Sequence, residues 1–160
     1  MFTKLSALKI LIIFFFCNNY FVVNANITGI PFIKNYKAKE YKGKTQNYAI
    51  IEDDRGLIYV ANGKGLLEYD GKEWRNIDLG ITSAVISFAK DANGRIYIGC
   101  VNDFGYLSHQ ANGKISFNSL LNLLPADKRN FADVWSIHIF KNEVFFRSYE
   151  YIFKYNKEQI

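Results

Sequence analysis

The feature that most constrains this chain is a pattern of short apolar runs and turn residues that occurs three times. In the clearest copy, residues 48–74, the turn segments are residues 53–56, 62–65 and 70–71. They are rich in glycine, asparagine and aspartate, which tolerate positive φ or close an Asx turn. Turns this close together predict a meander of four antiparallel strands, which we place at residues 48–51, 57–61, 66–69 and 73–77.

The second and third copies are found by aligning their turns with those of the first. When Gly94 is placed on Gly56, Asp91 aligns with Asp53 and Tyr97 with Tyr59. The third copy aligns with the first without gaps, which places Phe145 at the position of Tyr59. We expect these three rings to occupy equivalent buried positions. Between the second and third copies, residues 120–129 predict a helical turn that ends at a proline.

The repeats span residues 46–79, 83–118 and 131–160, and each has room for four strands. This period is typical of a propeller blade. The second run of each copy is apolar at consecutive positions, which indicates a strand packed on both faces. The sequence therefore predicts an all-β fold of about three four-stranded antiparallel meanders, the blades of an incomplete β-propeller. A β-sandwich is the alternative, but it does not predict self-similarity.

The repeat resembles a known family. Asp-Asp-Arg-Gly-Leu-Ile-Tyr-Val at residues 53–60, Asp-Ala-Asn-Gly-Arg-Ile-Tyr-Ile at residues 91–98 and the runs at residues 65–71 and 104–107 are similar to the two-component regulator propeller repeat. Such repeats open periplasmic sensors of Bacteroidetes-type bacteria, where two propellers precede a triple-tyrosine domain, a membrane helix and a histidine kinase or DNA-binding output. The resemblance implies that residues 26–160 are a partial sensor propeller, truncated before its remaining blades and output domain.

The N-terminal segment, residues 1–25, predicts a secretory signal peptide. Lys4 and Lys9 form a basic region, residues 10–16 are apolar, and Val-Asn-Ala at residues 23–25 suits cleavage. The alternative, a membrane anchor, needs about 20 apolar residues, and an asparagine pair interrupts this run. We therefore expect a periplasmic or secreted protein, with membrane attachment only through a segment C-terminal to this chain.

The net charge limits which binding partners can be expected, and the cysteine content limits which disulfides can form. Cleavage would remove two lysines and no acids from a formal charge of +5, leaving +3, which does not indicate nucleic-acid binding. Residues 26–41 predict a short edge or first strand, and the lysine-rich segment that overlaps it, residues 34–44 with five lysines, would protect it from association. Cys100 would be the one cysteine of the cleaved protein, so it predicts small-residue packing rather than a disulfide.

The sequence offers no catalytic constellation. His109 and His138 each lack a second histidine or cysteine at metal-ligand spacing. Residues 91–94 resemble part of a calcium loop, but Asn102 stands where that loop needs a glutamate. We therefore predict no catalytic residue, no metal and no cofactor.

The loops between the second and third strands of each copy open on one rim of a propeller. Their amides and aromatic side chains suit carbohydrate binding, the ligand class that the resemblance also implies. The candidate ligand-binding residues in these loops are Asn62, Lys64, Asn102, Asp103, Phe104 and Tyr149. The leading hypothesis is an extracytoplasmic ligand-sensing module of a two-component or one-component regulator, with an oligosaccharide as ligand. The alternatives are a fragment of a propeller-type glycan-active enzyme and a protein-interaction scaffold, and the loops can also be merely polar.

Overall fold

The structure is a computed structural model that describes residues 32–156. Contacts divide the chain into residues 1–34 and residues 35–160. All regular secondary structure in the described range belongs to the second unit. The predicted signal peptide lies outside the described residues. In the range that is described, no helix is long and apolar enough to cross a membrane.

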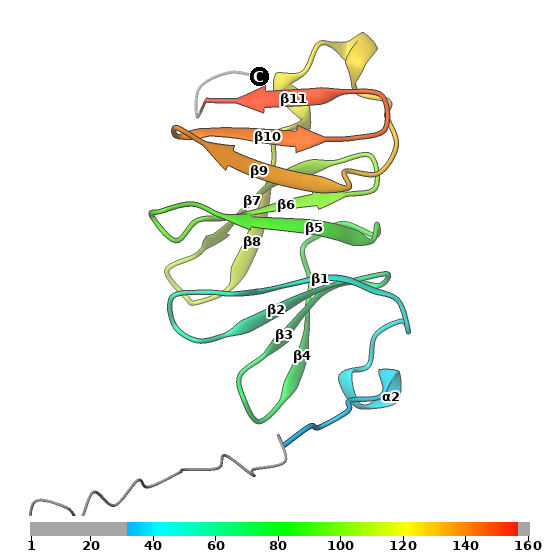
Figure 1. Cartoon of the computed structure of the whole chain (residues 1–160), viewed down its shortest axis with the longest axis vertical. Helices are drawn as coiled ribbons and strands as arrows, with labels where there is room; N and C mark the ends of the chain where they lie inside the picture. Colours follow the sequence, from blue (N-terminus) through cyan, green and yellow to red (C-terminus); the bar gives the residue numbers. More distant parts are fainter. Residues whose placement is uncertain (1–31, 157–160) are drawn as a thin grey trace, which may run out of the picture. The chain divides into compact units, whose positions relative to one another are not determined.

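The second unit contains three antiparallel sheets, each formed by consecutive strands. The first sheet comprises β1 (Asn47–Glu52), β2 (Ile58–Asn62), β3 (Gly65–Tyr69) and β4 (Trp74–Ile77). The second comprises β5 (Val85–Lys90), β6 (Ile96–Cys100), β7 (Phe104–His109) and β8 (Ile115–Ser119). The third comprises β9 (Ser136–Phe140), β10 (Glu143–Arg147) and β11 (Ile152–Tyr155), in the order β11-β10-β9. The second sheet lies between the other two (Figure 1). The predicted all-β fold of blade-like meanders is confirmed, and the place of a fourth strand in the third sheet falls outside the described residues.

The alignment of the first two copies is confirmed by an irregularity that both sheets share. Pairing of β1 with β2 shifts between Asn47 and Ala49, and pairing of β5 with β6 shifts between Val85 and Ser87. Each shift leaves one extra residue on the first strand, as a β-bulge does. The sequence alignment places Asn47 on Val85 and Ala49 on Ser87, so the two bulges occupy the same position of the repeat.

The gapless alignment of the third copy is wrong by one residue in its first strand. In the first sheet Ile51 pairs with Tyr59, whereas in the third sheet His138 pairs with Phe145. Ile51 therefore corresponds to His138 and not to Ile137. The cause is a shorter hairpin, because only two residues connect β9 and β10 where five connect β1 and β2.

The short hairpin of the third sheet depends on two residues with positive φ. Lys141 has φ 48° and Asn142 has φ 67°, the left-handed pair that a two-residue hairpin turn requires. Asn142 takes the place of Gly56, whose φ is 82°. Asparagine is one of the few residues that adopts this conformation at modest cost.

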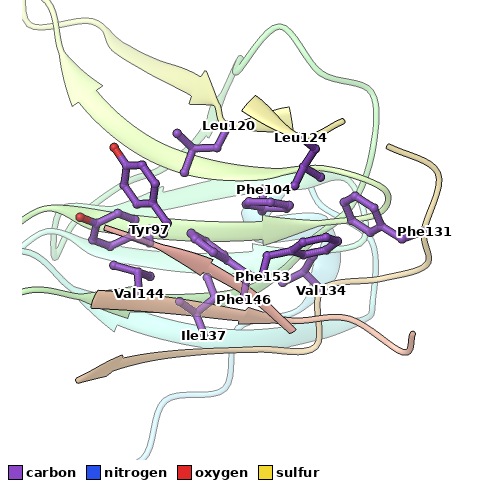
Figure 2. Packing of buried hydrophobic residues seen from close by; sticks show 11 residues of the cluster. Tyr97, Phe104, Leu120, Leu124, Phe131, Val134, Ile137, Val144, Phe146 and Phe153 are labelled. Carbon is purple, nitrogen blue, oxygen red and sulfur yellow. The ribbon is translucent and has the colours of Figure 1, made fainter. Parts of the chain in front are cut away.

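Two hydrophobic cores fill the spaces between adjacent sheets. The first lies between the first and second sheets and includes Tyr59 and Ile98, neither of which is exposed. The second lies between the second and third sheets and is centred on Phe104 (Figure 2). The ring of Phe104 lies 4.5 Å from that of Phe146 and 5.0 Å from that of Phe153. Buried aromatic rings at such separations dominate the stability of a core.

The expected equivalence of three buried rings holds for two of them. Tyr59 and Tyr97 are fully buried, each on the face of its sheet that packs against the next one. Phe145 lies at the corresponding position of β10 but is only half-buried. Its cross-strand partners are His138 and Lys154, both exposed. No sheet within the described residues covers this face, which explains the difference.

The predicted edge strand in the lysine-rich segment is wrong. Residues 32–37 have no regular secondary structure, and α2 (Ala38–Tyr41) is a single helical turn. The backbone N–H of Lys37 donates to Glu40 Oε2 at 2.7 Å and closes this turn. Tyr41 is 7% exposed and packs on the first sheet beside Trp74. Burial of the aromatic ring therefore decides the conformation, and the segment covers the sheet face opposite the first core.

The connection between the second and third sheets is helical, as predicted. It forms two 3-10 turns, Leu121–Leu123 and Ala126–Lys128, with Pro125 between them. Leu120 and Leu124 enter the second core (Figure 2). Cys100 is also fully buried, and burial raises the pKa of its thiol to about 12, in keeping with the predicted packing role.

Candidate functional site

A cleft with a volume of about 460 Å³ lies between the first and second sheets, where the β1–β2 and β5–β6 turns meet. Small-molecule sites commonly have volumes of about 300–1,000 Å³. We call it the Arg55 cleft. Its principal side chains are Asp53, Arg55, Asp91, Arg95, Tyr106 and His109.

The first wall of the cleft is shaped by an aspartate that holds its own turn closed. Asp53 Oδ1 accepts the backbone N–H groups of Arg55 at 2.9 Å and of Leu57 at 3.0 Å. The hydroxyl of Tyr59, from the neighbouring strand, donates to Asp53 Oδ2 at 3.5 Å. Local contacts of this kind fix the turn without help from the rest of the fold.

The second wall repeats this arrangement in the β5–β6 turn. Asp91 Oδ1 accepts the backbone N–H groups of Asn93 at 2.9 Å and of Arg95 at 3.0 Å. The hydroxyl of Tyr97 donates to Asp91 Oδ2 at 3.3 Å. The two walls are therefore equivalent turns of two repeats, which brings two carboxylates and two guanidinium groups to one cleft.

Arg55 is held in place by Asp53, which is only 7% exposed. Its Nε and Nη2 donate to Asp53 Oδ2 at 2.9 and 2.7 Å, and Nη2 also donates to the Tyr59 hydroxyl at 3.0 Å. Burial alone would raise the pKa of Asp53, but the hydrogen bonds from Arg55 and from two backbone N–H groups outweigh it and lower the pKa. The hydrogen bond to Asp53 raises the pKa of Arg55 in turn. Burial, followed by the charge of Glu68, raises the pKa of Tyr59.

Two polar contacts join the cleft walls across the sheets. Arg55 Nη2 lies 2.8 Å from His109 Nε2, at the end of β7. Lys90 Nζ lies 2.8 Å from Asp54 Oδ1. Gly94, with φ 78°, also lies so close to the Asp54 carboxylate that a side chain at this position would overlap it.

Arg95 stacks its guanidinium on the ring of Tyr106, 4.6 Å from the ring centroid, a favourable cation–π arrangement. Among the residues that the structure describes, Arg95 makes no ion pair with a carboxylate. Its side chain is exposed at the cleft mouth. A bound molecule can therefore reach its N–H donors.

The chemistry of the Arg55 cleft suits binding. Ser108 bonds to Ser116 Oγ at 2.9 Å, so the hydroxyl nearest His109 in the sequence is paired elsewhere. The carboxylates of Asp53 and Asp91 are engaged by backbone N–H groups. Within the described range no cluster of three or more His, Cys, Asp or Glu side chains can hold a metal ion.

The loop residues predicted to bind ligand lie at the opposite ends of the strands from the Arg55 cleft. Asn62 is fully buried, and its side chain bonds to the backbone of Lys44, Gln46 and Lys64. Phe104 is fully buried in the second core, so a ligand cannot stack on it. The side chain of Lys64 is exposed, although its Nζ donates to the backbone carbonyl of Lys42 at 2.8 Å.

The other three loop residues differ in how accessible they are. Asn102 has φ 56° and accepts the backbone N–H of Phe131 at 2.8 Å. Asp103 accepts the hydroxyl of Ser119 at 2.7 Å, and burial raises its pKa. Tyr149 is 83% exposed. Binding at this rim stays a prediction, carried by Lys64 and Tyr149.

Sequence reasoning missed Arg55 and His109 as partners because they are far apart in the chain and lie in different sheets. The repeat alignment was the one available signal. It pairs the turn at residues 53–56 with the turn at residues 91–94, which the structure places side by side.

A scan against protein-family models finds no match, and neither does a search of curated proteins. Among solved structures, the chain is similar to the extracellular domain of the putative one component system BT4673 from B. thetaiotaomicron, at 16% sequence identity and a TM-score of 0.43. The match covers 74% of this chain and 22% of that chain.

Proposed function

We propose that this chain is the ligand-binding part of an extracytoplasmic sensor and that it binds carbohydrate in the Arg55 cleft. The observation that carries the proposal is that hydrogen bonds within the protein already hold the polar side chains of both cleft walls in place. Asp53 and Asp91 are fixed by their own turns, and Arg55 is fixed by Asp53. Polar groups that are already ordered cost little entropy on binding.

The mixture of groups favours a neutral, hydroxyl-rich ligand. A sugar hydroxyl both donates and accepts a hydrogen bond, and the cleft offers guanidinium donors beside carboxylate acceptors. Opposite charges are balanced there, because the carboxylates of Asp53, Asp54 and Asp91 are offset by Arg55, by Arg95 and by Lys90, which pairs with Asp54. A strongly charged ligand therefore gains no advantage.

The shape of the site favours more than one sugar ring. A second depression of about 350 Å³ shares Arg55 with the cleft and extends toward Arg75 and Lys114. An oligosaccharide can fill both, with Arg55 between its units. The resemblance of the repeat further implies that the signal passes to an output domain of a longer protein.

Binding is better supported than hydrolysis, the enzyme alternative. Glycoside hydrolysis ordinarily needs two carboxyl groups that flank the scissile bond. Asp53 and Asp91 are the natural pair in this cleft, but both serve as acceptors for backbone N–H groups and for tyrosine hydroxyls.

Calorimetry with a panel of neutral oligosaccharides tests the proposal. We expect Arg95→Gln to weaken binding at least tenfold, because Arg95 is exposed at the cleft and has no structural ion pair to lose. Lys64→Gln and Tyr149→Ala, at the opposite rim, are matched controls that we expect to bind normally. Loss of binding in these controls instead would move the site to the predicted loops. Sugar cleavage would favour the enzyme, and no binding across the panel would refute the proposal.

A further inference from the structure

We propose that His109 is a proton-sensitive contact that ties the β7 side of the Arg55 cleft to Arg55 at neutral pH and releases that side when it is protonated. The inference concerns regulation of the cleft, so its effect on ligand rests on the proposed function. The contact between Arg55 and His109 does not depend on that function.

The chemistry of the contact fixes the state of the imidazole. A guanidinium group has only hydrogen-bond donors. His109 Nε2, 2.8 Å from Arg55 Nη2, must therefore accept, which requires a neutral ring with its proton on Nδ1. A protonated imidazole has two donors and no acceptor. Proton uptake replaces this hydrogen bond with two cations in contact.

His109, not Arg55, must move when the contact breaks. Asp53 Oδ2 holds the guanidinium through Nε at 2.9 Å and Nη2 at 2.7 Å. Nη2 has two hydrogens for three acceptors, so one of them is shared, and the Tyr59 hydroxyl at 3.0 Å keeps Arg55 in place when the imidazole leaves. The side chain of His109 is exposed, and His109 stands at the last paired position of β7, opposite Ile115. The ring can therefore rotate into solvent without disturbing the core.

Within the described residues, the other titratable groups around the contact are of types that do not ordinarily change charge in the range in which histidine does. Aspartate, glutamate, arginine, lysine and tyrosine side chains ordinarily keep their charge between pH 5 and 8. The groups that line this region come from the β1–β2 turn, β2, β3, β4 and the residue after it, the end of β5, the β5–β6 turn, β7 and the β7–β8 hairpin, and they are Asp53, Asp54, Arg55, Tyr59, Glu68, Arg75, Asp78, Lys90, Asp91, Arg95, Tyr106 and Lys114.

The opening is confined to one wall. The second cross-sheet contact, between Lys90 and Asp54, does not depend on the histidine. The first core, with Tyr59 and Ile98 fully buried, also stays closed. Acid pH therefore widens the cleft on the β7 side and leaves the Arg55 Nη2 donor without its imidazole acceptor.

The chain provides its own control, because it contains two histidines. His138 is exposed on β9, and its Nε2 lies 3.2 Å from Ser136 Oγ, away from the cleft. His138→Gln removes this second histidine and leaves the cleft intact. His109→Gln supplies an amide oxygen that accepts from Arg55 at any pH. The two variants therefore differ in whether the side chain that contacts Arg55 can take up a proton.

The experiment is a pH titration of the ¹⁵N-labelled protein followed by NMR of arginine side chains. Between pH 7.5 and 5.5 we expect the Arg55 guanidinium signals to shift in the wild type and in His138→Gln. In His109→Gln we expect no shift. A wild type without the shift, or an equal shift in His109→Gln, would overturn the inference.

A second readout links the contact to binding. For the tightest oligosaccharide of the panel, we expect affinity at pH 5.5 to be at least threefold weaker than at pH 7.5 in the wild type and in His138→Gln, but unchanged in His109→Gln. Equal pH dependence in all three proteins would refute regulation of the cleft by His109. If no sugar binds, the proposed function fails, while the NMR titration still decides the contact.

Discussion

Replacement of Asn62 by aspartate tests whether the hydrogen bonds of this side chain stabilise the fold. The change preserves the shape of the side chain but replaces the donor NH2 group with an acceptor oxygen. Asn62 is fully buried at the end of β2. Its Nδ2 donates to the carbonyls of Lys44 at 2.7 Å and Gln46 at 3.0 Å and to Asn47 Oδ1 at 2.7 Å. Its Oδ1 accepts the backbone N–H groups of Lys44 and Lys64, both at 2.9 Å.

The magnitude follows from these contacts. Aspartate keeps the acceptor but loses the donor, so three oxygen atoms face a carboxylate oxygen instead of N–H. Hydrogen bonds contribute about 0.5–1.5 kcal/mol each, which predicts that the free energy of unfolding falls by about 2–4 kcal/mol at pH 7.5. The surrounding oxygens favour the protonated acid and raise its folded-state pKa above the unfolded value. The loss should therefore shrink as the pH falls below that raised pKa, because the protonated acid donates one hydrogen bond.

Urea unfolding at pH 7.5 and pH 4.5 measures this effect. With an m-value of about 2 kcal/mol/M, the midpoint should fall by about 1–2 M at pH 7.5 and by less at pH 4.5. Asn76→Asp is the matched control, because Asn76 is exposed and its Nδ2 makes one bond of 3.4 Å, to the Tyr41 carbonyl. A midpoint for Asn62→Asp within error of the control at both pH values would refute the structural role.

Asp53→Asn removes the ion pair with Arg55 and should lower the free energy of unfolding by about 1–3 kcal/mol at pH 7. Because the folded-state pKa of Asp53 is lowered, the contribution is present above about pH 4 and is lost as the pH falls through the folded value. Urea midpoints of wild type and variant should therefore converge as the pH falls below the folded-state pKa of Asp53, and a constant difference down to acid pH would contradict this reasoning. Gly99→Ala would place a methyl group 2.6 Å from Val134 Cγ1, and such overpacking costs about 1–3 kcal/mol. Thermal unfolding should show the loss. Gly63→Ala should be nearly neutral, because its closest contact is the flexible Lys44 side chain at 3.1 Å and the Gln46 carbonyl lies at an ordinary contact distance of 3.8 Å. Equal melting temperatures of the two variants would disprove the close contact at Gly99.

The strands could be predicted because local signals and tertiary packing agree in this chain. Turn residues bracket each apolar run, and the second strands of the first two copies are buried as their consecutive apolar residues indicate; β6 is buried along its whole length. In the third copy β10 is buried on one face only. The third copy shows the limit of such reasoning. Its first strand slips by one residue because the hairpin at Lys141 and Asn142 is shorter, and a sequence alignment without gaps cannot register a shorter turn.

The lysine-rich segment was mispredicted for a different reason. Alternating residues such as Tyr36, Ala38 and Glu40 fit a strand, but the outcome depends on what Tyr36 and Tyr41 can bury against. Trp74, at the start of β4, offers them its ring at centroid distances of 5.3 and 5.7 Å. Periodicity describes a segment alone, and this segment takes its conformation from a distant partner.

The candidate site was harder to predict than the fold. Each of its aspartates has a sufficient local explanation as a turn residue, and the structure confirms that explanation for Asp53 and Asp91. The additional property, a shared cleft, arises only when equivalent turns of two sheets come together. The contact between Arg55 and His109 likewise depends on sheet packing, which no local pattern encodes.

The aspartate–tyrosine contact of the first two turns has a consequence for recognising this repeat. The third copy lacks both partners. Asp53 aligns with Ile139 in the gapless sequence alignment and with Phe140 in the register of the structure, and neither carries a carboxylate. Phe145, at the position of Tyr59, carries no hydroxyl. The contact needs both groups, so it is lost when either one is replaced. The aspartate and the tyrosine of this contact are therefore either both present or both absent in the three copies. A search for further copies of the repeat should score the aspartate and the aromatic ring on the following strand jointly, because treating them as independent columns would undercount copies such as the third.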